Sequence, residues 1–195
     1  MPASTTLRDV IGLDNQRPRL ADTTLVLIDF QNTYRSGVMA LEGVEEALAA
    51  AGRLLAAARA AGVPVVHVVD AGYDLDSELG AISSEVAPAE GEPVVVKKVP
   101  NGFHDTELEK TLRDLGAGKD LVLAGFMTHM CVTFTAEGAF HRGYRPTVVA
   151  EATATRSLTA PDGTVLPAAA LHTAALTTIT DVFGVVAPTV DDLIG

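Results

Sequence analysis

The segment Asp120–Gly143, DLVLAGFMTHMCVTFTAEGAFHRG, decides the fold. Its opening run, Asp120–Phe126, is almost entirely apolar, which is typical of a strand that is buried on both faces. From Cys131 onward the pattern becomes helical, and Gly143 ends the helix. A buried strand that leads into a helix is half of a β-α-β unit. The segment therefore predicts an α/β domain with a parallel sheet.

The same alternation of strands and helices runs along the rest of the chain. Apolar runs predict further strands at 23–30, 64–71, 93–98, 145–152 and 185–190. Helical spacing of apolar residues predicts further helices at 43–62, 105–116 and 166–184. We expect a three-layer αβα domain with a doubly wound, six-stranded parallel sheet of Rossmann-like type. Residues 1–20 are expected to form a lead-in segment and 21–195 the domain, in which the irregular segment 72–92 is long enough to be a lid.

Composition excludes several classes of protein. The 195 residues are 48% hydrophobic and include one cysteine, so the chain can build a core but no internal disulfide. The net charge of -11 opposes binding to a nucleic-acid backbone. No apolar run approaches the roughly 20 residues of a membrane span, and the first residues lack the pattern of a signal peptide. We expect a cytoplasmic protein that acts on a small molecule.

Chemically active residues gather at the predicted strand ends, where ligands bind in such folds. Asp29, Asp70 and the pair Lys97–Lys98 end three strands, and Cys131 follows a fourth. Each of these residues also has a purely structural interpretation. The aspartate could cap a turn, a lysine could point into solvent, and the thiol could be a small buried hydrophobic group. The position of Cys131 at the head of a helix, with Thr128 as a possible N-cap, favours a lowered thiol pKa. Together, the thiol, the carboxylate and the ammonium suit nucleophilic catalysis.

Three blocks carry a family resemblance: LVLIDFQNTY at 25–34, KKVPNGFHDTEL at 97–108 and LVLAGFMTHMCVTFTAEGAFHRGYRPTVVAEATATR at 121–156. In this order they resemble the isochorismatase-like cysteine hydrolases, which include nicotinamidases, N-carbamoylsarcosine amidohydrolases, streptothricin hydrolases and isochorismatase. The resemblance implies a catalytic triad of Asp29 as acid and base, Lys97 as stabiliser and Cys131 as nucleophile. Lys98 stays open as the alternative, because Asn101 and Gly102 depart from the family pattern that sets the lysine register.

The resemblance also implies a cis peptide bond at Phe126–Met127 and an oxyanion hole formed by the amides of Met127 and Cys131. The loop after the first strand lacks the Asp-x-His motif of the nicotinamidases, so we predict no metal and no cofactor. His129 is expected to be a turn or pocket residue rather than a partner of Cys131, since residues two apart at a helix start do not face each other. The expected pocket residues are Phe30, Tyr34, Phe103, Met127, His129 and Phe134.

These residues predict a cysteine amidohydrolase that cleaves a C–N bond (an amide, carbamoyl or lactam bond) through a covalent Cys131 intermediate. Two alternatives remain at this point. One is vinyl-ether hydrolysis of the isochorismatase type, and the other is a non-catalytic binding protein or thiol redox sensor on the same scaffold. The resemblance further implies a homo-oligomer, a dimer or a tetramer. The lead-in segment is expected either to pack on a neighbouring subunit or to form a disordered tail, and the sequence leaves both alternatives open.

Overall fold

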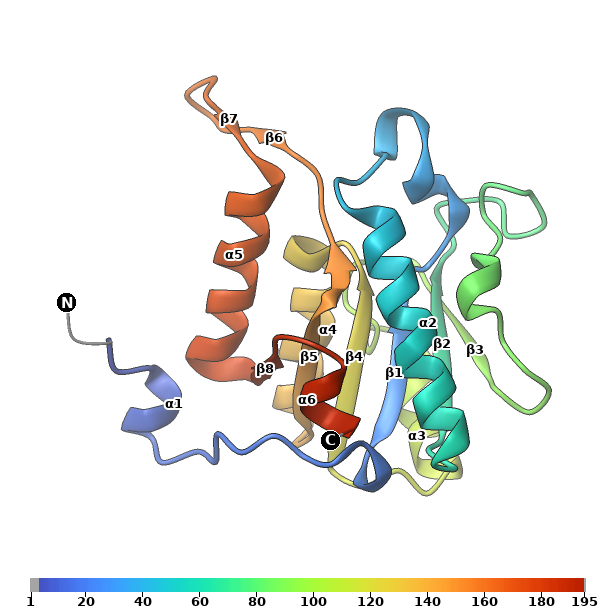
Figure 1. Cartoon of the computed structure of the whole chain (residues 1–195), viewed down its shortest axis with the longest axis vertical. Coiled ribbons are helices and arrows are strands. Elements are labelled where there is room, and N and C mark those ends of the chain that lie inside the picture. Colours follow the sequence, from blue (N-terminus) through green and yellow to red (C-terminus); the bar gives the residue numbers. More distant parts are fainter. Residues whose placement is uncertain (1–3, 195) are drawn as a thin grey trace.

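A computed structural model describes residues 4–194 as a central sheet between two helical layers (Figure 1). The order of its six strands is β3-β2-β1-β4-β5-β8, and every neighbouring pair is parallel. The strands are β1 (Thr24–Ile28), β2 (Val65–Asp70), β3 (Val94–Lys97), β4 (Asp120–Phe126), β5 (Arg145–Ala154) and β8 (Val185–Ala187). The predicted doubly wound α/β fold is confirmed.

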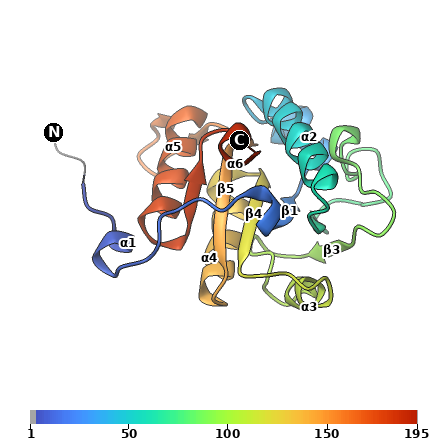
Figure 2. The same cartoon turned by 60° about the horizontal axis from the view of Figure 1, so that its bottom comes forward.

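Helices cover both faces of this sheet (Figure 2), and a hydrophobic core lies on each face. The α2 helix (Val44–Ala60) and α6 (Asp191–Ile194) pack on one face, and α3 (Leu108–Asp114) and α4 (Thr133–His141) pack on the other. The α5 helix (Ala168–Thr178) contributes Leu176 to the second core. In β1, Leu25 and Leu27 enter the first core while Val26 and Ile28 enter the second. Burial on both faces explains why the sequence of this strand is continuously apolar.

The β3 strand differs because it lies at the edge of the sheet. Val94 and Val96 are exposed, whereas Val95 and Lys97 on the alternate face are buried. This alternation sends Lys97 inward and leaves Lys98 exposed. The expectation that one lysine of the pair points to solvent and the other toward the crevice is thereby confirmed, with Lys97 as the inward one.

The connecting segments contain short elements of their own. Residues 157–167 contain an antiparallel hairpin of β6 (Leu158–Thr159) and β7 (Val165–Leu166). The lead-in contains α1 (Leu7–Val10), whose Leu7 amide donates to Asp181 of the same chain. Short 3-10 turns lie at Leu20–Asp22, Asn32–Arg35, Gly37–Met39 and Ser84–Val86, and π-helical turns at Thr128–Val132 and Ile179–Phe183. Among residues 4–194, no helix combines the length and apolarity of a membrane span.

The long segment 72–92 is fixed at its middle. The Gln31 side chain donates to the Gly80 carbonyl at 2.9 Å, and a β-bridge joins Gln31 to Ile82. Ser83 is fully buried and its hydroxyl donates to Asn32 Oδ1 at 2.8 Å. The middle of the segment is therefore tied to the residues that follow β1.

Candidate active site

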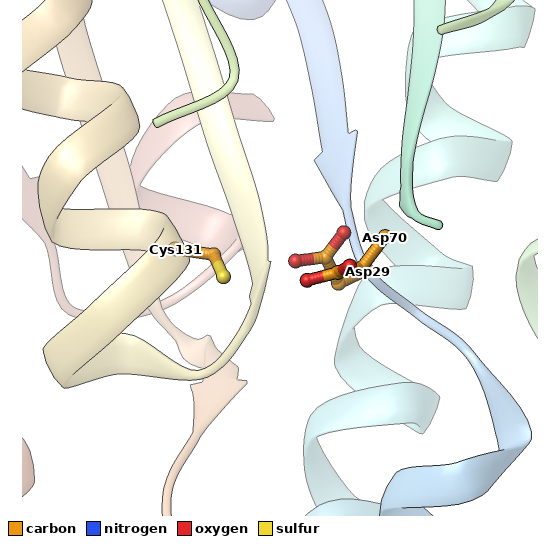
Figure 3. A group of neighbouring side chains, drawn as sticks. All are labelled: Asp29, Asp70 and Cys131. Atoms are coloured by element: carbon orange, nitrogen blue, oxygen red, sulfur yellow. The ribbon is translucent and has the colours of Figure 1, made fainter. Parts of the chain in front are cut away.

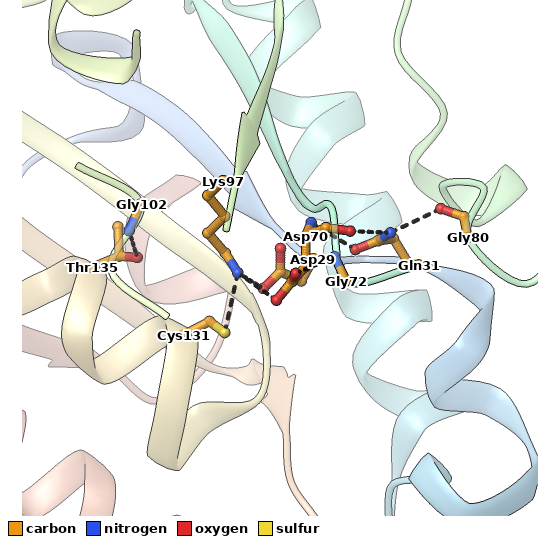
Figure 4. Close-up of polar contacts among 9 residues, drawn as sticks. All are labelled: Asp29, Gln31, Asp70, Gly72, Gly80, Lys97, Gly102, Cys131 and Thr135. Carbon is orange, nitrogen blue, oxygen red and sulfur yellow. Dashed lines mark hydrogen bonds and ion pairs between the residues drawn. The ribbon is translucent and has the colours of Figure 1, made fainter. Parts of the chain in front are cut away.

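Four side chains from separate strand ends meet at the carboxyl edge of the sheet (Figure 4). Asp29 follows β1, Asp70 ends β2, Lys97 ends β3 and Cys131 lies in the turn after β4. Lys97 Nζ is 2.8 Å from Asp29 Oδ2, 3.1 Å from Asp70 Oδ2 and 3.4 Å from Cys131 Sγ. The three predicted triad residues are thus brought together around the ammonium of Lys97. Lys98 takes no part in this cluster, because it is exposed.

Backbone geometry at the ends of β1 and β4 places Asp29 against the cysteine turn. Asp29 has a left-handed conformation, with φ of 52°, and its amide donates to the Val68 carbonyl at 2.8 Å. Beside it, Gly125 has φ of 144°, and a Cβ atom there would lie 2.0 Å from the Ile28 carbonyl oxygen. Only glycine allows such a close approach. The turn after β4 can therefore begin directly beside the end of β1.

Lys97 is fully buried, which is costly for an ammonium unless it is paired. Burial by itself would lower the pKa of Lys97, but the neighbouring Asp29, Cys131 and Asp70 outweigh it and hold the pKa above its usual value. The lysine is therefore a permanent cation at neutral pH. Its register partner across the sheet is Asp70, so the pairing of β2 with β3 itself positions the ammonium.

Asp29 and Cys131 are both held toward their protonated forms. Burial raises the pKa of Asp29 from 3.8 to about 6, although Lys97 opposes the shift. Burial, followed by the negative charge of Asp29, raises the pKa of Cys131 to about 12, again against the effect of Lys97. The prediction that the helix start would lower the thiol pKa is wrong, because desolvation dominates at a residue that is 4% exposed. The resting thiol is neutral and needs a base.

Asp29 can be that base. Its Oδ2 atom is ion-paired with Lys97 at 2.8 Å, and among residues 4–194 its buried Oδ1 atom has no hydrogen-bond partner, so a lone pair remains available for a proton. One carboxylate oxygen and Cys131 Sγ lie within 4.8 Å of each other. Proton transfer between buried groups at this separation needs only a small side-chain movement.

The turn that carries Cys131 is π-helical over Thr128–Val132 rather than the first turn of an α-helix. Thr128 does not cap it: Met127 occupies the cap position, and the Thr128 hydroxyl instead contacts His172 Nδ1 at 3.0 Å. The Phe126–Met127 peptide bond is cis. In the described part of the chain the Met127 amide donates no hydrogen bond, which leaves it free for a ligand oxygen beside Cys131.

Asp29, Asp70 and Cys131 are the one group within residues 4–194 whose ligand atoms could together hold a metal ion (Figure 3). Lys97 Nζ lies within 3.4 Å of an atom from each of them and already supplies the positive charge. A cation at this place would have to displace the ammonium. Asp29, Asp70 and Cys131 therefore suit the Lys97 ammonium better than a metal ion. The absence of a catalytic metal stays a prediction.

The predicted pocket residues divide into two groups. Phe30 and Tyr34 are buried against Phe126, with ring centroids 4.7 and 5.8 Å from it, in the core that also holds Met127. Phe103 is buried in the core that contains Cys131, stacked on Tyr144.

His129 and Phe134 lie apart from the thiol chemistry. His129 Nδ1 contacts Thr155 Oγ1 at 2.5 Å, which agrees with its expected place in the turn. Phe134 does not face the triad: it is 44% exposed and lines a surface hollow of about 320 Å³ with Val99 and His104. A larger hollow of about 540 Å³ lies at the amino edge of the sheet, beside Asp120 and Arg145, far from the triad chemistry. The triad itself is enclosed, since Asp29 and Lys97 have no exposed surface.

Gln31 supports the site and was missed as a functional residue. It is buried, and its side chain accepts from the Asp70 amide at 2.9 Å while donating to the Asp70 carbonyl at 3.2 Å. These two hydrogen bonds fix the backbone of Asp70, whose carboxylate is ion-paired with Lys97. The signal was its position two residues after Asp29, in the first family block.

Comparisons with known proteins identify the family of this chain. The family model of the isochorismatase domain matches the sequence of this chain over residues 23–191, so the chain belongs to the isochorismatase family. A secreted isochorismatase effector, Isc1, of Verticillium dahliae is 37% identical over 91% of this chain and 93% of its own. A ureidoacrylate amidohydrolase, RutB, of Pseudomonas syringae is 30% identical over 70% of this chain and 72% of its own. The crystal structure of an isochorismatase from Pseudomonas putida superposes with a TM-score of 0.93 at 40% identity, covering 98% of this chain and 100% of that one. Together these relatives support a hydrolase.

Proposed function

We propose that the protein is a cysteine amidohydrolase that cleaves a C–N bond of a small amide, carbamoyl compound or lactam. The observation that carries the proposal is the buried ammonium of Lys97, in contact with both Asp29 and Cys131. The ureidoacrylate amidohydrolase among the relatives, by its name, cleaves such a bond.

The proposed reaction begins with proton transfer from Cys131 Sγ to Asp29 as the thiolate attacks the substrate carbonyl carbon. The amides of Met127 and Cys131 donate to the resulting oxyanion. The intermediate then expels the amine, which takes the proton from Asp29, and a thioester remains. A water molecule, deprotonated by Asp29, attacks the thioester, releases the acid and leaves the thiol to recover the proton. Lys97 offsets the negative charge at each stage.

The pKa of Asp29 suits both of its roles. A group with a pKa of about 6 can accept a proton and return it near neutral pH, which a carboxyl group near 3.8 would do poorly. The Cys131 thiol, with its raised pKa, loses its proton only as the bond to carbon forms.

The test is a panel of ureido acids, primary amides and lactams, with release of ammonia or amine as the readout. Cys131→Ala and Asp29→Asn should each lower kcat by at least about a thousandfold on any hydrolysed compound. Lys98→Gln is the matched control and should leave kcat unchanged. Intact mass spectrometry during turnover should detect an acyl group on the single cysteine. Hydrolysis that survives both active-site substitutions would contradict the proposal.

The similarity to isochorismatases favours one second candidate, hydrolysis of a vinyl ether. That reaction needs no acyl intermediate on sulfur. Turnover of isochorismate by both the wild-type protein and Cys131→Ala, with no adduct in the mass spectrum, would identify it.

A further inference from the structure

The Thr128 hydroxyl makes an unusual hydrogen bond for a threonine in a helical segment of this protein. Five other threonines donate their hydroxyls to a backbone carbonyl four or five residues earlier in the same segment: Thr133, Thr173, Thr177, Thr178 and Thr180. Thr128 Oγ1 instead lies 3.0 Å from Nδ1 of His172, which is 44 residues away on α5. Thr128 is fully buried and directly follows Met127. The contact therefore joins the nucleophile turn to a separate helix.

His172 lies on the buried face of α5. On this helix and the turn that follows it, the buried residues recur at helical spacing: Ala168, Ala175 and Ile179. His172 falls on the same stripe, where an apolar side chain would be usual, yet its Nδ1 atom reaches Thr128. Leu176 on the next turn of α5 packs against the core that contains Cys131. The helix is therefore anchored beside the turn that it supports.

Hydrogen bonds hold the peptide group between Met127 and Thr128 on each side. The Met127 carbonyl accepts from two amides of the same turn, at 3.0 and 3.3 Å. The Thr128 carbonyl accepts from the Thr133 hydroxyl at 2.6 Å, and the contact with His172 fixes the Thr128 side chain. By contrast, the Met127 amide donates to no acceptor within residues 4–194. The surrounding bonds therefore fix the direction of this amide without competing for its hydrogen.

The donors of an oxyanion hole must be aimed before the negative charge develops. A displacement of about 1 Å can lower a rate roughly a hundredfold, so the residues that hold a donor in place matter as well as the donor. We propose that His172 is a positioning residue of the active site, which acts through the Thr128 hydroxyl to aim the Met127 amide at the oxyanion. This inference rests on the proposed function, since it names a residue that supports the same site. His172 does not touch the reacting atoms.

Two reactions of Cys131 test the inference, because only one of them forms an oxyanion. With 4-nitrophenyl acetate, a bond forms between Cys131 Sγ and the acetyl carbon, 4-nitrophenolate leaves with the electron pair of the broken C–O bond, and the thiol proton passes to Asp29 or to solvent. With iodoacetamide, Sγ bonds to the methylene carbon, iodide leaves with the electron pair, and no charge develops on a carbonyl oxygen.

Both rates are followed by intact mass spectrometry at about pH 8.5. They are corrected for the labelling of Cys131→Ala, and the ratio of acylation to alkylation is normalised to the ratio for glutathione. The wild-type ratio should exceed that of glutathione, and both His172→Leu and Thr128→Val should lower it at least about fivefold. The double variant should lie within about twofold of either single variant, because the two side chains act through one hydrogen bond.

Conservative variants and a matched control separate positioning from packing. His172→Asn places an amide near the position of Nδ1, and Thr128→Ser keeps the hydroxyl, so each should restore most of the ratio. His141→Gln is the control, because His141 is a histidine on α4 that is 60% exposed, and it should change the ratio less than about twofold. Thr128→Val preserves the shape of the side chain, so the test holds even where His172→Leu fails to fold.

Several results would overturn the inference. One is a wild-type ratio no higher than that of glutathione, and another is a smaller fall than expected in Thr128→Val or in folded His172→Leu. A further fall in the double variant would show that the two residues act separately. A parallel fall of both rates would indicate a general distortion of the turn. Because neither reaction uses an amide substrate, each of these outcomes is distinct from a failure of the amide panel.

Discussion

The pH dependence of stability should report the proton on Asp29. This carboxyl group is fully buried, and burial raises its pKa from 3.8 to about 6. Between these two values the folded protein holds a proton that the unfolded chain has lost. A raised pKa stabilises the folded state below the unfolded value, and this stabilisation is lost as the pH rises through the folded value. The difference between 3.8 and about 6, at ~1.4 kcal/mol for each pH unit, amounts to about 3 kcal/mol.

The assay is urea unfolding of the wild-type protein and Asp29→Asn between about pH 4 and pH 7.5. Groups whose pKa is lowered by their partners, such as Glu92, contribute equally to both proteins and cancel in the difference. The wild-type free energy of unfolding, relative to that of the variant, should fall by about 3 kcal/mol, mostly between pH 4 and 6. Asp105→Asn is the matched control, because Asp105 has a similar φ of 51° but an exposed side chain. Parallel pH profiles for wild type and Asp29→Asn, within about 1 kcal/mol, would refute the reasoning.

Three other substitutions or treatments have expected outcomes. Lys97→Met should lower the free energy of unfolding by about 3–5 kcal/mol in the same urea titration, because it leaves buried anions without a counter-charge. Lys98→Met, at an exposed position, should change the free energy of unfolding by less than about 0.5 kcal/mol. Gly125→Ala should destabilise the protein by more than about 3 kcal/mol in thermal unfolding, because the new Cβ atom would clash with the Ile28 carbonyl. Gly118→Ala is the control and should not change the stability, because no atom lies within 4 Å of its new Cβ. Iodoacetamide should alkylate Cys131 more slowly than it alkylates glutathione at pH 7, with a rate that still rises above pH 10; a plateau near pH 8.5 would contradict the raised pKa of about 12.

Burial on both sides of the sheet explains how much of the fold could be predicted. The β1 and β4 strands are continuously apolar because helices cover both of their faces, and this pattern cannot be confused with an amphipathic helix. The β3 strand is equally rich in valine, yet Val94 and Val96 are exposed. Its place at the edge depends on the strand order, which local sequence does not encode. The π-helical turn at Thr128–Val132 was missed for a similar reason, since one widened turn is too short to alter a helical period.

The site was predictable where a residue type, a strand end and a family block coincided, as they do at Asp29, Lys97 and Cys131. Gln31 lacked that coincidence. The importance of Gln31 lies in hydrogen bonds to the backbone of Asp70, which is 39 residues away in the sequence.

The direction of the Cys131 pKa changes what reactivity can prove about this thiol. A helix start that lowered the pKa would make slow alkylation a sign of a non-catalytic cysteine. In the structure, the thiol and Asp29 instead share a buried site with one ammonium, which favours a single negative charge between them. That charge rests on Asp29 while the thiol stays protonated, and it moves to sulfur only as the proton moves to Asp29. Slow alkylation of the resting Cys131 thiol is therefore expected even if the protein is an active enzyme. Acylation that depends on substrate, rather than intrinsic reactivity, is what separates a hydrolase from an inert scaffold.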